Sequence, residues 1–351
     1  MNDGVALLAH DSPLVDDVRR LAAIAGATVE VVAHPDGVRG CWRRSRLVLV
    51  DAALADRVVA LDVGRRDGVV LLAEQTDRVE AWQSAARLGA QQVLAPGRDE
   101  QDLLDLMAVA CDPADGPPAP VVGFLPGSGG AGASTVAVAA AVRAAAAGRE
   151  VTLVDADPAG GGLELLLGAE RVDGLRWSDL ADVRGVVASQ ALDDALPHVA
   201  GVRLVSHTSA APADVPADAM TAVLAAARRR ASVVVVDLPR SPGSAAAAAL
   251  GRCDVVVVVV LAEVRAIAAA GLALRSAGSR LADLRLVVRT PARSRLRASE
   301  VGAALGLPVA ATVPHDTDLA AAADRGDLPR ALGRSTVGRI AEQLLTAAVP
   351  L

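Results

Sequence analysis

Hydrophobic residues in the first part of the chain fall into short runs separated by segments with helical spacing. The runs, at 5–10, 28–34, 46–51, 68–74 and 91–96, are typical of strands. The segments at 12–26, 78–89 and 99–110 repeat apolar residues at the intervals of an amphipathic helix. Gly26 and Gly89 stand where two of these helices should end in a left-handed residue. This alternation predicts a parallel sheet with right-handed crossovers.

The same alternation continues over a longer span after a segment that can form neither helix nor central strand. Strands are predicted at 120–126, 150–157, 202–207, 232–239, 254–262, 284–290 and 308–314. Roughly seven strands with intervening helices indicate a doubly wound, mostly parallel sheet. The segment "CDPADGPPAP" predicts a linker at 112–120, because its prolines interrupt regular structure. We therefore expect domains at 1–111 and 121–351.

Composition narrows the classes of function. The chain has 351 residues, 52% of them apolar, which suits two folded domains with sizeable cores. A net charge of −6 and 1% aromatic residues disfavour a nucleic-acid-binding protein. Three widely spaced cysteines and the absence of a signal-peptide pattern predict a cytoplasmic protein. All basic side chains other than histidine are arginine.

A glycine-rich segment, "GSGGAGAST", follows the predicted strand at 120–126 and precedes a predicted helix at 135–147. Strand, glycine loop and helix form the context of a phosphate-binding loop. Main-chain N–H groups converge there on an anion, which the helix N-terminus also favours. The alternative is a strand-to-helix turn without a ligand. The predicted nucleotide-binding residues are Gly127, Ser128, Gly129, Gly130, Ala131, Gly132, Ala133, Ser134 and Thr135.

Acidic residues follow two strands of the same predicted sheet. Asp155 and Asp157 come after one strand, and Asp237 ends the buried run "SVVVVD". Ligands of open α/β sheets bind at the carboxyl ends of the strands. We therefore predict Ser134, Asp155 and Asp237 as Mg²⁺ ligands.

Together these motifs resemble the MinD/ParA family of P-loop ATPases with a deviant Walker A motif. "SGGAGAST" resembles the family's Lys-Gly-Gly-x-Gly-Lys-Ser/Thr-Thr, and "DADPAGG" resembles its DxDPQGG segment. The stretch "PVAATVPHDTDLAAAADRGD" resembles its C-terminal strand and adenine-side loop. The resemblance extends from about 121 to 348. It implies a P-loop NTPase-like fold, ATP or ADP with Mg²⁺ as cofactor, and a catalytic role for Asp157 in orienting water.

Both family lysines are missing, since Ser128 and Ala133 stand in their places. In the family, one lysine contacts the β- and γ-phosphates and the other reaches the partner subunit's phosphates in a dimer. A hydrogen bond to a charged group contributes about 1.5–3 kcal/mol, so binding should weaken roughly tenfold to a hundredfold. The loss of the lysines should reduce ATP hydrolysis more than it reduces nucleotide binding. We expect weak nucleotide binding, little or no ATPase activity, and any homodimer to depend on apolar packing. Alternatively, an arginine such as Arg240 or Arg265 restores the charge.

The first domain resembles a response-regulator receiver of the flavodoxin-like fold. Asp51 stands at the phosphoacceptor position, and Asp11 offers one acid of the expected pair. Ala73 or Glu74 replaces the usual hydroxyl residue, and Ala95 replaces the lysine. These losses imply a pseudo-receiver in which Asp51 caps the next turn and the domain serves as a docking or dimerisation surface. The alternative is an aspartyl-phosphate switch at Asp51.

A pseudo-receiver joined to a MinD-like domain resembles the CpaE/TadZ group, which includes the septum-site-determining Ssd proteins. The resemblance implies a regulator that positions septum formation or Flp/Tad pilus and secretion machinery through protein partners, at a pole or septum. A slow MinD-type ATPase and a ParA-type partition protein are the alternatives. The C-terminal helical segment at 334–351 has few basic residues and no aromatics. We expect it to pack on the domain, leaving membrane association peripheral or dependent on partners.

Overall fold

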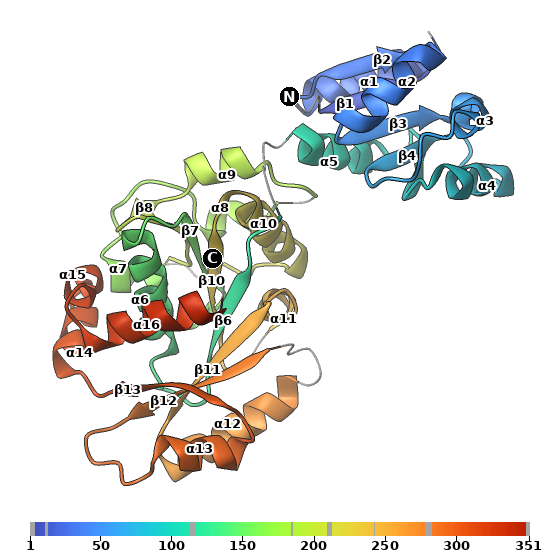
Figure 1. Ribbon diagram of the computed structural model, residues 1–351. Helices are drawn as coiled ribbons and strands as arrows, with labels where there is room; N and C mark the ends of the chain where they lie inside the picture. Colours follow the sequence, from blue (N-terminus) through green and yellow to red (C-terminus); the bar gives the residue numbers. More distant parts are fainter. Residues whose placement is uncertain are drawn as a thin grey trace. The chain divides into compact units, whose positions relative to one another are not determined.

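The computed structural model describes residues 4–10, 13–111, 117–183, 185–208, 213–241, 243–277 and 283–348 (Figure 1). The chain divides into two compact units, Met1–Pro113 with Gly185–Ala188, and Ala114–Arg184 with Ser189–Leu351. Of the linker predicted at 112–120, residues 112–116 lie outside the described part.

The first unit is built on a five-stranded parallel sheet in the order β2-β1-β3-β4-β5, the order of flavodoxin-like folds. The strands are β1 (Val5–Leu8), β2 (Val29–Val32), β3 (Leu47–Asp51), β4 (Val69–Leu72) and β5 (Gln92–Leu94). The helices are α1 (Pro13–Ile24), α2 (Pro35–Arg44), η1 (Ala52–Leu54), α3 (Ala55–Ala60), α4 (Val79–Leu88) and α5 (Glu100–Cys111). All five predicted strands are confirmed, and Gly26 and Gly89 have φ of 65° and 73°.

Alternating strand residues build a core on each face of this sheet. Leu8 of β1 packs with Cys41 of α2 and Ala85 of α4 on one face. Leu7 packs with Leu21 of α1 and Met107 of α5 on the other. The unit is therefore a sheet between two helical layers, as the strand–helix alternation predicts.

The second unit contains an eight-stranded sheet in the order β13-β12-β11-β6-β10-β7-β9-β8. Its strands are β6 (Val121–Pro126), β7 (Val151–Asp155), β8 (His198–Val199), β9 (Val202–Val205), β10 (Val233–Asp237), β11 (Val255–Leu261), β12 (Leu284–Thr290) and β13 (Val309–Pro314). All neighbours are parallel except β8 and β9. The seven predicted strands are confirmed. The eighth, β8, has two residues and is too short to show a hydrophobic period.

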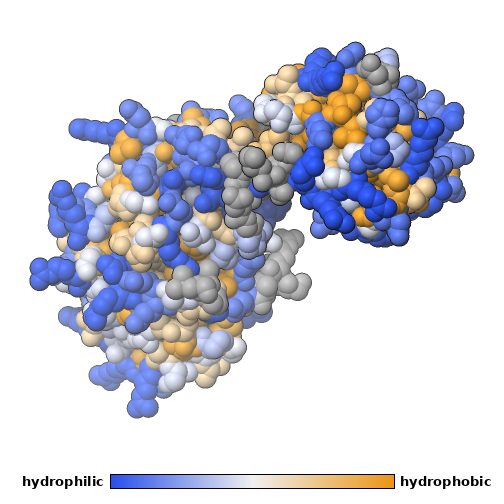
Figure 2. Space-filling view, turned by 45° about the horizontal axis from the view of Figure 1, so that its top comes forward, coloured by the Kyte–Doolittle hydropathy of each residue, from blue (hydrophilic) through white to orange (hydrophobic). Residues whose placement is uncertain are grey.

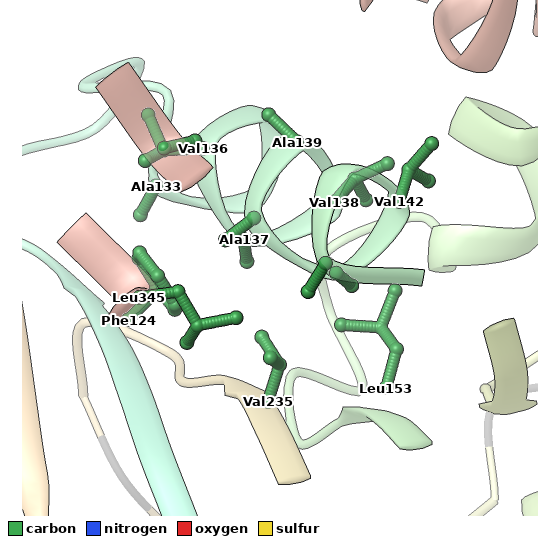
Figure 3. Close-up of a cluster of buried hydrophobic side chains, with 14 of the residues drawn as sticks. Phe124, Ala133, Val136, Ala137, Val138, Ala139, Val142, Leu153, Val235 and Leu345 are labelled. Carbon is green, nitrogen blue, oxygen red and sulfur yellow. The ribbon is translucent and has the colours of Figure 1, made fainter. Parts of the chain in front are cut away.

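The helices of this unit are α6 (Ala133–Ala146), α7 (Leu163–Leu167), α8 (Trp177–Leu180), α9 (Ser189–Ala195), α10 (Ala217–Arg230), α11 (Ser244–Leu250), α12 (Val264–Ala277), α13 (Ala298–Leu305), α14 (Thr317–Ala323), α15 (Leu328–Leu332) and α16 (Thr336–Ala348). The alanine-rich α6 is the central helix, and its small side chains let it lie close to the sheet. Phe124, Leu153 and Val235 reach toward it from three strands (Figure 3). Leu345 adds the apolar face of α16 to the same core.

Polar side chains cover most of the surface seen in Figure 2, with apolar areas between them. The most exposed large apolar side chains among the described residues are Val264 on α12, Val79 on α4 and Ile24 on α1. Among the helices of the described ranges, none combines the length and the apolar character needed to cross a bilayer.

Candidate functional site

The glycine loop links the central strand of the large sheet to its central helix. β6 ends at Pro126, and α6 begins at Ala133 with Gly132 as its N-cap. The helix therefore starts two residues before the predicted position, so Ala133 and Ser134 belong to its first turn. The first intrahelical bond runs from the Val136 N–H to the Gly132 carbonyl over 3.1 Å. The N–H groups that precede it have no partner within the helix, which is the arrangement that suits an anion.

Two loop glycines are required, Gly127 by the packing around it and Gly132 by its backbone conformation. A Cβ on Gly127 would lie 2.7 Å from Cγ2 of Val260 and 2.8 Å from Cβ of Ala270. Gly132 has a φ of 83°, and a Cβ there would lie 2.2 Å from Nη1 of Arg289. The glycines therefore keep the loop tight against the sheet and open at its outer positions.

Neighbouring strands bring the predicted acidic residues to the edge of the sheet beside this loop. β10 pairs with β6 and β7, with Asp237 opposite Phe124 on one side and Asp155 on the other. The Ala156 N–H donates to the Asp237 carbonyl over 2.9 Å, which ties the two strand ends together. Parallel strands lie about 4.8 Å apart, so the two carboxylates are close neighbours.

Asp237 is almost completely buried, with 3% of its surface exposed. It accepts a hydrogen bond from the Ser134 hydroxyl, which joins two of the predicted Mg²⁺ ligands. Its Oδ1 has no hydrogen-bond partner within the described part of the chain. Burial raises the pKa of Asp237 to about 8, and the negative charges of Asp155 and Asp157 add to the effect.

Asp155 uses its carboxylate to hold the segment that follows it. It accepts N–H groups from Asp157 over 3.1 Å and Leu163 over 3.0 Å, and the Ser206 hydroxyl over 3.3 Å. Burial, partly offset by these bonds, raises the pKa of Asp155 to about 6. The Trp177 indole N–H also donates to the Asp155 main-chain carbonyl over 2.7 Å. Asp155 is therefore a structural anchor of the segment and has fewer lone pairs for a metal than Asp237.

Asp157, the predicted water-orienting residue, is half-buried at the start of an exposed turn. Its Oδ1 accepts the Ala159 N–H over 3.0 Å, and its carbonyl accepts the Gly160 N–H over 3.1 Å. The turn holds this carboxyl at the same sheet edge as Asp155 and Asp237.

A buried polar cluster behind this segment was not identified from the sequence. Glu164 and Arg176 form an ion pair of 3.1 Å with side chains only 5% and 8% exposed. Arg176 also donates to the carbonyls of Ala169 and Val172, at 3.1 and 2.9 Å. Beside it, the ring centroids of Trp177 and His207 lie 6.2 Å apart. The cluster fixes the turns after "DADPAGG", and no sequence motif marks it.

The loop also has a cationic neighbour that sequence reasoning missed. Arg289, near the end of β12, donates through Nη1 to the Ala131 carbonyl over 3.0 Å. Burial lowers the pKa of this half-buried guanidinium. Arg240 and Arg265, the two arginines suggested by the sequence, are exposed and form no ion pair within the described residues.

The receiver-like site in the first unit has Asp51 at the phosphoacceptor position, without the hydroxyl residue and the lysine that a receiver carries around it. Asp51 caps η1, since its Oδ1 accepts the Ala53 N–H over 2.9 Å, as the pseudo-receiver interpretation predicts. A cavity of about 880 Å³ beside it is lined by Ala73, Glu74 and Ala95, where a receiver would carry its hydroxyl and lysine. The predicted acid at Asp11 lies outside the described residues.

Comparisons with known proteins agree with this architecture. Residues 8–118 match a family model described as "Rv3660c-like, CheY-like N-terminal domain". Rv3660c of Mycobacterium tuberculosis strain H37Rv is 38% identical over 339 residues, covering 95% of each chain. The chain belongs to the Rv3660c-like family.

Solved structures show the fold of the rest of this Rv3660c-like protein. A ParA family ATPase from Chlorobium tepidum matches with a TM-score of 0.56, 18% identity, and coverage of 65% of this chain and 98% of that one. MinD from Pyrococcus horikoshii, complexed with Mg-ADP, matches with a TM-score of 0.55, 20% identity and coverage of 66% and 96%. The Rv3660c-like chain thus combines a CheY-like domain with a MinD/ParA-type domain, as predicted.

The site of this Rv3660c-like protein has oxygen donors of the kind that Mg²⁺ prefers. The unpartnered Oδ1 of Asp237 and the buried, unpartnered Oγ of Ser128 fit a ligand with polar groups at the loop. Within the described residues, no group of three or more His, Cys, Asp or Glu side chains is arranged to hold a metal ion by itself. A cation here would therefore need phosphate oxygens as additional ligands, which is the usual mode for Mg²⁺ with nucleotides.

Proposed function

We propose that this protein is a MinD-type spatial regulator that binds ADP or ATP weakly and hydrolyses ATP slowly or not at all. It acts through protein contacts on septum formation or on pilus and secretion machinery, from the cytoplasmic side of a pole or septum. One observation carries the proposal. The loop keeps the glycines and the free helix N-terminus of a phosphate cradle, although Ser128 and Ala133 replace its lysines.

In this proposal, main-chain N–H groups of residues 128–135 bind the phosphates. Ser134 and Asp237 hold Mg²⁺ together with phosphate oxygens, and Asp155 keeps the following segment in place. Bound Mg²⁺ would neutralise negative charge on the phosphates. Asp157 would orient a water molecule, but a site with reduced positive charge gives the transferring phosphoryl group little stabilisation.

The MinD-type fold supports a protein partner for this chain. The composition of the chain disfavours a nucleic-acid partner. MinD from Aquifex aeolicus forms a complex with MinC, and it matches this chain with a TM-score of 0.54 and 21% identity. The net charge of −6 and the scarcity of aromatic residues disfavour DNA or RNA as partner. We propose that partner proteins, and a homodimer held by apolar packing, determine where the protein acts.

Calorimetric titration of the full chain with Mg-ADP and Mg-ATP tests the proposal. We expect dissociation constants roughly tenfold to a hundredfold weaker than those of a lysine-containing loop. Phosphate release measured on the same sample should be close to background. No detectable binding at millimolar nucleotide would refute nucleotide control, and salt-sensitive retention of DNA on a filter would favour a partition protein instead.

A slow ATPase that releases its partner on turnover is the second candidate. It is favoured by the three carboxyl groups that meet beside the loop, since Asp155, Asp157 and Asp237 are all at the sheet edge. ATP hydrolysis clearly above background that Asp157→Ala abolishes would establish it. The control is Asp179→Ala, which removes the carboxylate that takes part in the capping box of α8.

A further inference from the structure

Arg289 places a positive charge directly against the loop that lacks its lysines. Its Nη1 lies 3.0 Å from the Ala131 carbonyl, and it would lie 2.2 Å from a Cβ at Gly132. Gly132 is the N-cap of α6, so the guanidinium stands beside the end of the helix where anions are favoured. One hydrogen bond to Ala131 uses one of the five N–H donors of the side chain.

This guanidinium has no ion-pair partner within the described part of the chain. Arg289 takes part in none of the ion pairs there, and no carboxylate contributes to the change in its pKa. Partial burial of a cation without a counterion is unfavourable, and proteins normally offset it with an anion. Arg143 on α6, by contrast, is paired with Glu342 over 2.7 Å.

Two further groups around the same loop also have no hydrogen-bond partner among the residues that the structure describes. Oγ of Ser128 is buried without a hydrogen bond, and so is Oδ1 of Asp237, a residue that is 3% exposed. Buried polar atoms are nearly always paired in native proteins. A loop with an unpaired cation, an unpaired hydroxyl and an unpaired carboxyl oxygen is therefore arranged for a ligand that has anionic oxygens and a bound cation.

We propose that Arg289 binds the phosphate groups of the nucleotide and supplies, from β12, the positive charge that Ser128 and Ala133 cannot provide. The inference rests on the proposed nucleotide binding and identifies Arg289 as the residue that supplies positive charge for it. A guanidinium suits this task, since its planar fork can donate two parallel hydrogen bonds to one phosphate. The ligand class is a nucleoside di- or triphosphate, recognised here through its phosphates and not its base.

The test compares variants of one strand in the full chain. Arg289→Gln removes the charge, and Arg289→Lys keeps it without the fork. Arg285→Gln is the matched control, because Arg285 lies on the same strand but four residues nearer its start, and pairs with Asp283 over 3.1 Å. Binding of Mg-ADP and of adenosine is measured by calorimetry, and thermal unfolding checks that each variant is folded.

We expect Arg289→Gln to weaken Mg-ADP binding roughly tenfold to a hundredfold. Arg289→Lys should weaken it less, and Arg285→Gln should not change it. Adenosine binding should be the same in all four proteins, since it has no phosphate.

Several results would overturn the inference. If Arg289→Gln binds Mg-ADP as the wild type does, the charge of Arg289 does not contribute to phosphate binding. Tighter binding would mean that Arg289 blocks the loop, and equal losses for ADP and adenosine would assign it to the base or to loop structure. Wild-type protein that binds no nucleotide would refute the proposed function as well, whereas the first three results would leave that function standing.

Discussion

Asp237 combines deep burial with a carboxyl oxygen that has no hydrogen-bond partner among the described residues. Its raised pKa, about 8, means that the carboxyl group is mostly protonated at neutral pH in the absence of a cation. In the unfolded chain the same group ionises near 3.8. Between these values the folded protein binds more protons than the unfolded one, so the contribution of Asp237 to stability falls as pH rises from about 4 to 8.

Asp237→Asn should prevent this loss of stability at high pH, because the amide resembles the neutral carboxyl group. Without Mg²⁺ and nucleotide, we expect the variant to match the wild type near pH 5. At pH 9 it should be more stable by up to about 6 kcal/mol, since the pKa values of 3.8 and about 8 differ by about four units and each pKa unit corresponds to about 1.4 kcal/mol. Chemical unfolding at pH 5, 7 and 9 in EDTA measures the difference. Asp283→Asn, at an exposed carboxylate, serves as the control; parallel pH profiles for wild type and Asp237→Asn would contradict the prediction.

Two loop glycines should respond differently to the same substitution. Gly132→Ala places a Cβ against Arg289 at a φ of 83°, and we expect a loss of about 1–3 kcal/mol in unfolding free energy. Gly129→Ala meets nothing within 4 Å and should change stability by less than about 0.5 kcal/mol. Urea unfolding of both variants checks this pair. Equal effects would mean that the loop does not hold the described conformation.

The sequence located the loop and the acidic residues because each lies within a short motif next to a strand. Arg289 could not be found in this way, since its contact with Ala131 joins positions 158 residues apart. The strand "LRLVVRT" contains two arginines, and no spacing marks Arg289 as a site residue. The two arginines that follow strand ends in the sequence, Arg240 and Arg265, are exposed instead.

At the scale of elements, α16 completes the core of the large sheet. Val337, Ala341, Leu344 and Leu345 are buried against α6 and its neighbours, and Glu342 pairs with Arg143. The apolar face of this helix is therefore occupied by the protein's own core. Its sequence predicted a packed helix, because it lacks the aromatic and basic residues of helices that lie on membranes.

Leu345→Ala should lower the unfolding free energy of the second unit by about 2–4 kcal/mol, because it leaves a cavity beside α6. Thr346→Ala, one residue further along and exposed, should cost less than about 0.5 kcal/mol. Thermal unfolding followed by circular dichroism compares the two. A small effect of Leu345→Ala would show that α16 is detached in solution.

Strands and long helices were predictable from their hydrophobic period, whereas α2 was not. Its sequence, "PDGVRGCWRR", contains two glycines, which lower helix propensity. Val38, Cys41 and Trp42 nevertheless form its buried face. Packing against the sheet therefore stabilises a helix that local preference disfavours.

At the scale of the whole molecule, each unit has a core of its own. The two clusters of the first unit contain residues no later than Cys111, and the α6 cluster begins at Val122. The separation into a CheY-like and a MinD/ParA-type part therefore extends to the packing. We propose that the boundary lies in the predicted linker at 112–120.

A fragment of residues 1–113 should fold without the rest of the chain. We expect a helical circular dichroism spectrum and a cooperative unfolding transition, since single domains of this size usually unfold in one step. The fragment 114–351 should behave likewise. A non-cooperative transition for 1–113 would show that this unit depends on residues outside it, with 185–188 the first to add back.

The position of Trp177 allows its intrinsic fluorescence to report on the large unit. The chain has three tryptophans and no tyrosine, and Trp42 and Trp82 both belong to the first unit. Trp177 is fully buried, and its indole is bonded to Asp155 at the acidic edge of the sheet. In a Trp42→Phe, Trp82→Phe background, the emission spectrum would come from this indole alone. Any rearrangement of the segment after β7 would then be read as a change in fluorescence, without a label.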